Sequence, residues 1–269
     1  MKPVFCFIDD ASFELENFRQ NAAPAFQGVE WVLAADWREC QDRLAGRAPL
    51  CFLLDLYGRL GDAPPSQLPR PDELEALLAG VASPGEILER ARREPDPVNA
   101  FLRGLFVQVN RWQEAFSQAA QALGQSPAFG LANLAQVRRE HPFAAALGYS
   151  RKALYQDAMA FTLAGGCGLL QKPQGGDPAA IARATRGKAQ ILAQACYRAV
   201  DRRLTHWGAH ALAVKASSLL EGKGTLAGVA AAMAGLAKDG QAGAREDSVR
   251  QPYDILIKWS EWRGENNGR

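Results

Sequence analysis

The chain has 269 residues and a formal net charge of +2, with 48% hydrophobic and 22% charged residues. This composition is typical of a globular protein and excludes an intrinsically disordered one. A net charge this close to zero gives no indication of a surface for nucleic acid or membrane. The five cysteines show no CxxC or Cys/His spacing, which argues against a structural zinc site and favours reduced, buried thiols.

The first ten residues, MKPVFCFIDD, run directly into a strand pattern and contain two acids. A secretory leader would need a longer apolar core and a cleavage site. The most apolar late segment, residues 224–240, is too short to span a bilayer and contains a lysine near its end. We therefore expect a cytoplasmic protein with no membrane segment.

Short apolar runs alternate with helical patterns in the first part of the chain. Strands are predicted over residues 4–8, 29–35 and 49–56, and helices over 11–22 and 37–44. Strands that alternate with helices at this short spacing predict βαβ units and a parallel sheet.

The alternation stops between residues 59 and 125, where no strand is predicted. A proline-rich loop is followed by two short helical segments and a long helix over 98–123, whose apolar residues recur at steps of three and four. We expect this helix to bury its large apolar side chains, or to be an interface for another chain if they are exposed. These side chains are Phe101, Leu105, Phe106, Trp112 and Phe116.

After residue 127 the alternation returns. Helices are predicted over 129–141, 153–166 and 178–200, and strands over 143–150 and 168–173. The sequence therefore predicts an α/β fold with a doubly wound, five-stranded parallel sheet, an all-α insertion after the third strand and an all-α C-terminal region.

The predicted domains follow from this pattern. Residues 1–58 and 126–185 form one α/β domain from two stretches of the chain. Residues 59–125 form a helical insertion, and residues 186–269 form a helical C-terminal extension.

Polar residues stand where the first, third and fifth strands are predicted to end. Asp9 and Asp10 follow the first, Asp55 the third and Lys172 the fifth. In an open parallel sheet, ligands bind at the carboxyl ends of the strands. If the first and third strands are neighbours, their three carboxylates repel one another unless a hard cation such as Mg²⁺ lies among them. With a lysine nearby, this set is suited to phosphoryl transfer, and one carboxylate would be the nucleophile.

Three motifs carry these residues: IDD after the first strand, LLDLYG at the third and LLQKP at the fifth. In this order they resemble the receiver domain of two-component response regulators. The resemblance covers residues 1–58 and 127–185 and implies the flavodoxin-like fold of that family. It also implies a cis peptide bond between Lys172 and Pro173.

The resemblance implies a role for each of these residues. Asp9, Asp10 and Asp55 would hold Mg²⁺, and the backbone carbonyl of Tyr57 would complete the set. Asp55 would accept a phosphoryl group from a histidine kinase or a phosphotransfer protein in a phosphorelay. Lys172 would contact that phosphoryl group.

The fourth and fifth strands depart from the family pattern. The hydroxyl residue that usually ends strand four is Ser150 when counted back from Lys172, but counting forward along the strand places Leu147 there, and both assignments stay open. Arg151 follows Ser150 where the family prefers a small side chain. Leu169 stands where an aromatic residue is common.

Two alternative functions follow from the same residues. The first is a pseudo-receiver scaffold or adaptor that keeps the fold without using phosphorylation. The second is a haloacid-dehalogenase-like phosphatase, because LLDLYG is similar to that family's nucleophile motif. However, Tyr57 stands where that family has a second acid, so we expect a phosphoacceptor and not a turnover enzyme. A third, simpler interpretation makes Asp9 and Asp10 helix N-caps without any metal.

We expect the protein to pass on its signal through protein–protein contacts. The C-terminal extension is predicted to mediate self-association or to bind a dedicated partner, through the small residues from Ala227 onwards and the anchors Trp259 and Trp262. The sequence argues against DNA binding, because its candidate recognition helix has few side chains that could reach bases. His206 and His210 have no evident third ligand nearby and are interpreted as surface or packing residues.

Overall fold

The structure is a computed structural model of the protein, and it has two compact units: Met1–Leu56 with Gly130–Arg269, and Tyr57–Phe129. It describes residues 2–59, 72–73, 76, 79, 82–220, 259 and 262, with the backbone alone over 205–220. The small residues that follow Ala227 and the side chains of the two histidines therefore lie outside the described residues. No helix in the described part of the chain is long and apolar enough to cross a membrane.

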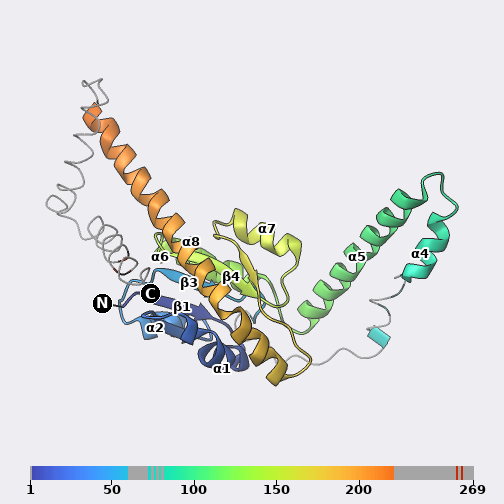
Figure 1. Ribbon diagram of the computed structural model, residues 1–269, viewed down its shortest axis with the longest axis horizontal. Coiled ribbons are helices and arrows are strands. Elements are labelled where there is room, and N and C mark those ends of the chain that lie inside the picture. The colour runs from blue at the N-terminus through green and yellow to red at the C-terminus, as the bar shows by residue number, and fades with distance from the viewer. Residues whose placement is uncertain are drawn as a thin grey trace. The chain divides into compact units, whose positions relative to one another are not determined.

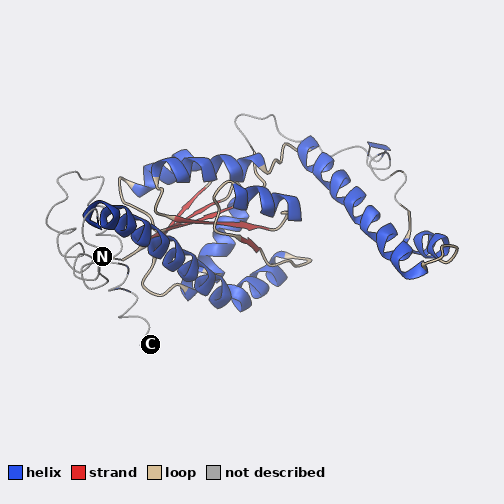
Figure 2. Cartoon of the chain, turned by 90° about the horizontal axis from the view of Figure 1, so that it is seen from above, coloured by secondary structure: helices blue, strands red, loops and turns tan. Residues whose placement is uncertain are grey.

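The first unit is built on one parallel sheet of five strands in the order β2-β1-β3-β4-β5, shown in red in Figure 2. The strands are β1 (Val4–Ile8), β2 (Glu30–Ala34), β3 (Cys51–Leu54), β4 (Ala145–Ser150) and β5 (Leu169–Gln171). Every residue of β1, β3 and β4 is buried. Their apolar runs are typical of parallel strands that are covered on both faces. The predicted doubly wound α/β sheet is confirmed.

Helices connect the strands of this unit (Figure 1). They are α1 (Ser12–Asn21), the short 3₁₀ turn η1 (Ala23–Ala25), α2 (Trp37–Leu44), α6 (Ala128–Glu140) and α7 (Tyr155–Leu163), and α8 (Pro178–Leu220) follows the last strand. The first two residues of α6 belong to the second unit. Local sequence sets several of the helix starts. Asp36 accepts a hydrogen bond from the backbone N–H of Glu39, and Asp177 accepts one from that of Ala180 at the start of α8.

The largest core cluster lies where α1 and α8 pack on one face of the sheet. Phe5 and Phe7 of β1, Phe18 of α1 and Cys196 of α8 belong to it, and all are buried. On the other face, Trp37 of α2 stacks on Phe52 of β3 with ring centroids 5.7 Å apart. Alternate residues of the central strands thus pack against two separate layers of helices, one on each face of the sheet.

The two C-terminal tryptophans pack against their own domain. Trp259 is 4% exposed, belongs to the core cluster and donates a hydrogen bond from Nε1 to Asp201 at 2.6 Å. Its ring stacks on Trp262 with centroids 5.0 Å apart, and Trp262 also contacts Tyr197. The predicted use of Trp259 as an anchor for a partner is therefore wrong, because Phe5 of β1 and Tyr197 of α8 already pack against it, whereas that of the half-buried Trp262 stays a prediction.

The second unit contains a helical hairpin of α4 (Pro84–Ala91) and α5 (Pro97–Ala122). Ser83 and Glu86 form a capping box at the start of α4, and Asp96 caps α5 just before a proline at its first position. The backbones of Gly58 and Ser126 form an antiparallel bridge with N···O distances of 3.3 and 3.0 Å. The two ends of the inserted segment therefore meet.

The predicted burial along the long helix is wrong for Phe106, Trp112 and Phe116, which are 67%, 51% and 38% exposed. Phe101 and Leu105 are half-buried. The physical reason is the length of the partner helix: α4 has eight residues and covers only one face of α5. The large apolar side chains lie mainly on the other faces.

Candidate functional site

The site begins with three carboxylates at the carboxyl ends of β1 and β3. These strands are neighbours, and Ile8 pairs with Leu54, so the residues that follow them lie side by side. Asp9, Asp10 and Asp55 each offer an oxygen atom within 4.8 Å of the others. The sequence therefore correctly predicted that these three residues come together.

The environments of the three acids differ. Asp9 is fully buried, Asp55 is 5% exposed and Asp10 is half-buried. One oxygen of Asp9 accepts a hydrogen bond from the backbone N–H of Ala11 at 3.0 Å, just before α1. This contact resembles a helix cap, but it uses only Oδ1. The other oxygen, Oδ2, is turned to a cation.

That cation is Lys172, at the end of β5. Its side chain is 3% exposed, and its Nζ forms an ion pair with Asp9 Oδ2 and lies 3.4 Å from Asp55 Oδ1. The ammonium group also lies 5.6 Å from the centre of the Phe7 ring and 5.8 Å from that of Tyr149. Strand order explains this meeting, because β1, β3 and β5 all end at the same edge of the sheet.

A fourth acid, Glu14, completes the surroundings of Lys172 and was missed by the sequence analysis. It lies in the first turn of α1, and its Oε2 is 4.0 Å from Lys172 Nζ. Its partner is Arg151, whose Nη1 is 2.8 Å from Glu14 Oε1 and whose Nε donates to the carbonyl of Pro173 at 3.1 Å. Arg151 therefore links the loop after β4 to α1 and to the loop after β5.

Charge and burial oppose each other in this cluster. Burial, reinforced by the nearby Asp55, raises the pKa of Asp9 to about 7, although Lys172 acts to lower it. Burial also disfavours the charged form of Lys172, but Asp9, Asp55 and Glu14 outweigh it, and the pKa of Lys172 is raised. Burial therefore determines the pKa shift of Asp9, whereas the surrounding carboxylates determine that of Lys172.

The donor set fits a hard divalent cation. Lys172 Nζ contacts Asp9 and Asp55, and an oxygen atom of the third carboxylate, Asp10, lies within 4.8 Å of theirs. Clustered carboxylate oxygens are the ligands that Mg²⁺ and Ca²⁺ prefer. Burial raises the pKa of Asp9, and a bound cation would act against this shift because it favours the ionised carboxylate.

Ser150 occupies the end of strand four. β4 pairs with β3 so that Leu53 faces Leu147, which lies within the strand, and the last strand residue is Ser150. Its side chain is 1% exposed, and its hydroxyl oxygen has no hydrogen-bond partner among the described residues. Its carbonyl accepts from the backbone N–H of Lys172 at 3.1 Å. Buried hydroxyls are nearly always hydrogen-bonded, so this one can bind a group that enters the site.

Gly130, at the start of α6, is a second residue that the sequence analysis missed. A Cβ atom at this position would lie 2.6 Å from the backbone oxygen of Asp55 and 2.6 Å from Cα of Leu56. The N–H of Gly130 donates to the carbonyl of Leu56 at 3.0 Å. The helix thus packs directly against the backbone that carries Asp55, and only glycine allows this approach.

The remaining predicted positions are distributed as follows. Tyr57 is buried, and its ring lies 5.9 Å from that of Phe116, in the second unit. Leu169 is half-buried in β5. The peptide bond between Lys172 and Pro173 is trans, so the implied cis bond is wrong. The role of the Tyr57 carbonyl as a metal ligand stays a prediction.

The solved structures that are similar to this chain include two response regulators. One is a CheY-like receiver domain from Methanospirillum hungatei JF-1, with 12% identity and a TM-score of 0.35, covering 71% of this chain and 96% of that one. The other is a response regulator from Burkholderia pseudomallei with a phosphorylated aspartic acid, calcium ion and citrate. It has 15% identity and a TM-score of 0.34, and the match covers 87% of this chain and 93% of that one. Neither the family models nor the curated proteins contain a match to this chain.

The fold itself is established by the sheet. Five parallel strands in the order β2-β1-β3-β4-β5, with helices on both faces, form the flavodoxin-like arrangement that receiver domains share. The resemblance that the three motifs suggested is therefore confirmed at the level of the fold.

Proposed function

We propose that this receiver-like protein is a signalling protein whose Asp55 accepts a phosphoryl group in the presence of Mg²⁺ and whose output runs through protein contacts. The observation that supports this most directly is the buried ammonium group of Lys172, which lies against both Asp9 and Asp55. A cation at this place can pair with phosphoryl oxygens as soon as they arrive. The proposal makes the protein a phosphoacceptor and not a turnover enzyme, and it includes the cytoplasmic location expected from the sequence.

Asp9, Asp10 and Asp55 would hold the metal ion, with the carbonyl of Tyr57 as a further ligand. The ion, when bound, would neutralise negative charge on the incoming phosphoryl group. A carboxylate oxygen of Asp55 attacks phosphorus, and the P–N bond of a phosphohistidine donor breaks as the new P–O bond forms. The donor imidazole keeps the electron pair of the broken bond. A histidine kinase or a phosphotransfer protein is thus the proposed donor.

The chain's own residues would then stabilise the acyl phosphate. Lys172 exchanges its contact with the Asp55 carboxylate for one with a phosphoryl oxygen. The hydroxyl of Ser150, which has no partner among the described residues, donates a hydrogen bond to another. Movement of Ser150 toward this oxygen would alter the loop after β4, where Arg151 contacts Glu14.

An exposed apolar stripe on α7 supports an output through protein contacts. Tyr155, Met159 and Leu163 are 75%, 48% and 84% exposed. Because they are four residues apart, they lie along one side of the helix. This helix directly follows the loop that contains Arg151, so a change in that loop would reach the stripe.

A pseudo-receiver scaffold is the second candidate, and one observation favours it. Lys172 already pairs with Asp9 and lies within 4.0 Å of Glu14, so the site has partial charge compensation without any metal. In this alternative, Lys172 is a structural counter-ion and Asp55 is not phosphorylated.

The two candidates differ in a direct measurement. The full-length protein is incubated with Mg²⁺ and acetyl phosphate, and intact mass is recorded for wild type and for Asp55→Asn. The proposal expects one added phosphoryl group on wild type, lost on hydroxylamine treatment, and none on Asp55→Asn. No addition to wild type with any of several small phosphodonors would favour the scaffold, and equal addition to both proteins would place the acceptor elsewhere.

A further inference from the structure

The second unit carries an exposed apolar surface on a single helix. Seven of the thirteen exposed large hydrophobic side chains among the described residues lie on α5. They are Val98, Leu102, Phe106, Val107, Val109, Trp112 and Phe116. Monomeric proteins rarely expose a contiguous apolar patch of this size without an interaction to cover it.

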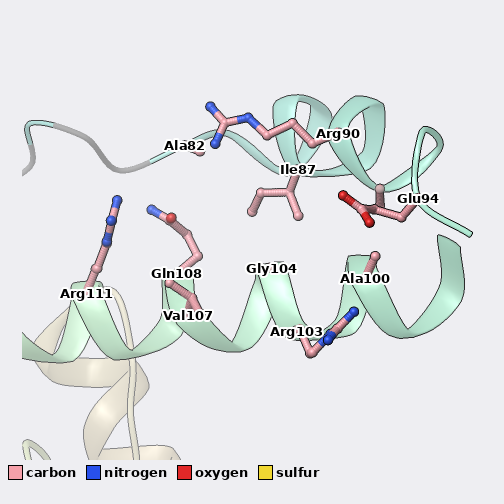
Figure 3. A pocket seen from close by; sticks show the side chains of 11 residues that line it. Ala82, Ile87, Arg90, Glu94, Ala100, Arg103, Gly104, Val107, Gln108 and Arg111 are labelled. Carbon is pink, nitrogen blue, oxygen red and sulfur yellow. The ribbon is translucent and has the colours of Figure 1, made fainter. Parts of the chain in front are cut away.

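The partner helix covers a different part of α5. Figure 3 shows α4 above the face of α5 that carries Ala100, Gly104 and Gln108, with a cavity of about 380 Å³ between the two helices. A side chain at Gly104 would collide with Ile87 of α4. Leu102 and Phe106 each lie two residues from Gly104 and therefore point away from α4, because successive residues are about 100° apart around a helix.

Five of the exposed residues form what we call the apolar stripe of α5: Leu102, Phe106, Val109, Trp112 and Phe116. Their spacings along the helix are four, three, three and four residues, so the pattern is the same in both directions from Val109. This residue also lies near the middle of α5, which runs from Pro97 to Ala122. A stripe with this symmetry matches a second copy of itself when the two helices are antiparallel.

We propose that two copies of this chain associate through their α5 helices, antiparallel about a two-fold axis at Val109. The axis places Val109 beside its own copy. Phe106 then shares a layer with Trp112 of the other copy, and Leu102 shares one with Phe116. Each contact occurs twice, as in any two-fold symmetric interface. Together with the two α4 helices, this makes a four-helix arrangement.

The charged residues beside the stripe and the area of the stripe are consistent with a second copy of the chain as its partner. Arg103 and Glu114 are both exposed and are eleven residues apart, about three helical turns, so they lie on the same side of the stripe, and Arg103 also borders the cavity next to α4. The two-fold axis brings Arg103 of one copy within one residue of the position that faces Glu114 of the other. The five side chains of the stripe would bury on the order of 500 Å² from each copy, which is more than half of the roughly 800 Å² per partner of stable interfaces.

The first test measures oligomeric state with the full-length protein, without a phosphodonor, so that it does not depend on Asp55. Light scattering after size exclusion, over a range of concentrations, should give a dimer mass for wild type. Phe106→Asp should be monomeric, or dissociate at a concentration at least tenfold higher. Val107→Asp is the matched control, because Val107 is 52% exposed on the same helix but lines the cavity on the α4 side. It should remain dimeric, and circular dichroism should be equal for all three proteins.

The second test examines whether the two-fold axis passes beside Val109. In a Cys167→Ser background, which removes the exposed native thiol, Val109→Cys should form cross-linked dimers with a short bis-maleimide reagent. Phe106→Cys alone should not, but a mixture of Phe106→Cys and Trp112→Cys chains should. Arg103→Glu or Glu114→Arg alone should weaken the dimer, and the double variant should restore it.

Several outcomes would overturn the proposal. A wild-type protein that is monomeric at every concentration would show that the stripe is covered by other parts of the same chain or by a different protein. A dimer that survives Phe106→Asp would have its interface elsewhere. Efficient cross-linking of Phe106→Cys to itself would indicate a parallel pair and contradict the two-fold axis at Val109.

Discussion

Lys172 and Asp9 form an ion pair in which both side chains are almost completely removed from water, with 3% and 0% of the side chains exposed. A buried pair contributes little net stability compared with apolar residues of the same size, but loss of one partner leaves an uncompensated charge. The pair therefore makes the stability of the sheet edge depend on the same residues that we propose for function.

The first prediction concerns Lys172→Met, which keeps the length of the side chain but removes its charge. It should lower the free energy of unfolding by about 3–5 kcal/mol at neutral pH, because Asp9 and Asp55 lose their cation. Denaturant unfolding would measure this. Lys188→Met, on the exposed side of α8, is the matched control and should change stability by less than about 0.5 kcal/mol. Equal effects of the two changes would mean that the buried pair has no special role.

A second prediction concerns pH. The pKa of Asp9 in the folded protein is raised to about 7 from an ordinary value of 3.8. The folded state therefore holds a proton that the unfolded state has released, and its stabilising effect is complete below pH 3.8 and is lost as pH rises to about 7. Without divalent metal, the contribution of Asp9 should decrease by at most about 1.4 kcal/mol per pH unit over that range.

Asp9→Asn should remove this contribution, so the difference in unfolding free energy between wild type and variant should vary between pH 4 and 7. Asp42→Asn, at an exposed position of α2, is the control and should leave the pH dependence of stability unchanged. If the unfolding free energies of wild type and Asp9→Asn change in parallel with pH over this range, the pKa of Asp9 is not raised in the folded protein.

The third prediction concerns Ser150→Ala. Since the hydroxyl has no partner in the described part of the chain, its removal should leave the free energy of unfolding unchanged or raise it by about 1–3 kcal/mol. Ser83→Ala, which removes a hydrogen-bonded helix cap, should instead lower stability by about 0.5–2 kcal/mol. With Mg²⁺ and beryllofluoride, which imitates a phosphoryl group, wild type should gain melting temperature and Ser150→Ala should gain less. A full response in Ser150→Ala would exclude the hydroxyl as a phosphoryl ligand.

The fourth prediction compares two glycines within helices. Gly130→Ala should lower the free energy of unfolding by about 1–3 kcal/mol, since its Cβ would collide with the backbone of Asp55 and Leu56. Gly187→Ala in α8 meets nothing within 4 Å and should raise it by about 0.5–1 kcal/mol. Thermal unfolding would measure the expected decrease for Gly130→Ala and the expected increase for Gly187→Ala. Gly130→Ala should also weaken the response to Mg²⁺, because it displaces Asp55, and an unchanged response would contradict this.

The sequence predicted the sheet and most of the site because both depend on local patterns. Each buried strand is a short apolar run, and Asp9, Asp55 and Lys172 mark the places where such runs stop. Parallel strands then bring these ends to one edge without further information.

The residues that could not be predicted depend on contacts between distant segments. Counting could not separate Ser150 from Leu147, because the register of β4 is set by its pairing with β3. Glu14 approaches Lys172 only because α1 and β5 meet in three dimensions. The apolar pattern of α5 correctly predicted a helix, but it could not show which face of that helix α4 covers.

The bridge between Gly58 and Ser126 has a consequence for how this architecture can change. Because the inserted segment starts and finishes at paired backbone positions, its removal requires only a tight turn in its place. Evolution can therefore gain, lose or exchange such a module in one genetic event, and a protein engineer can graft another hairpin whose ends have the same separation.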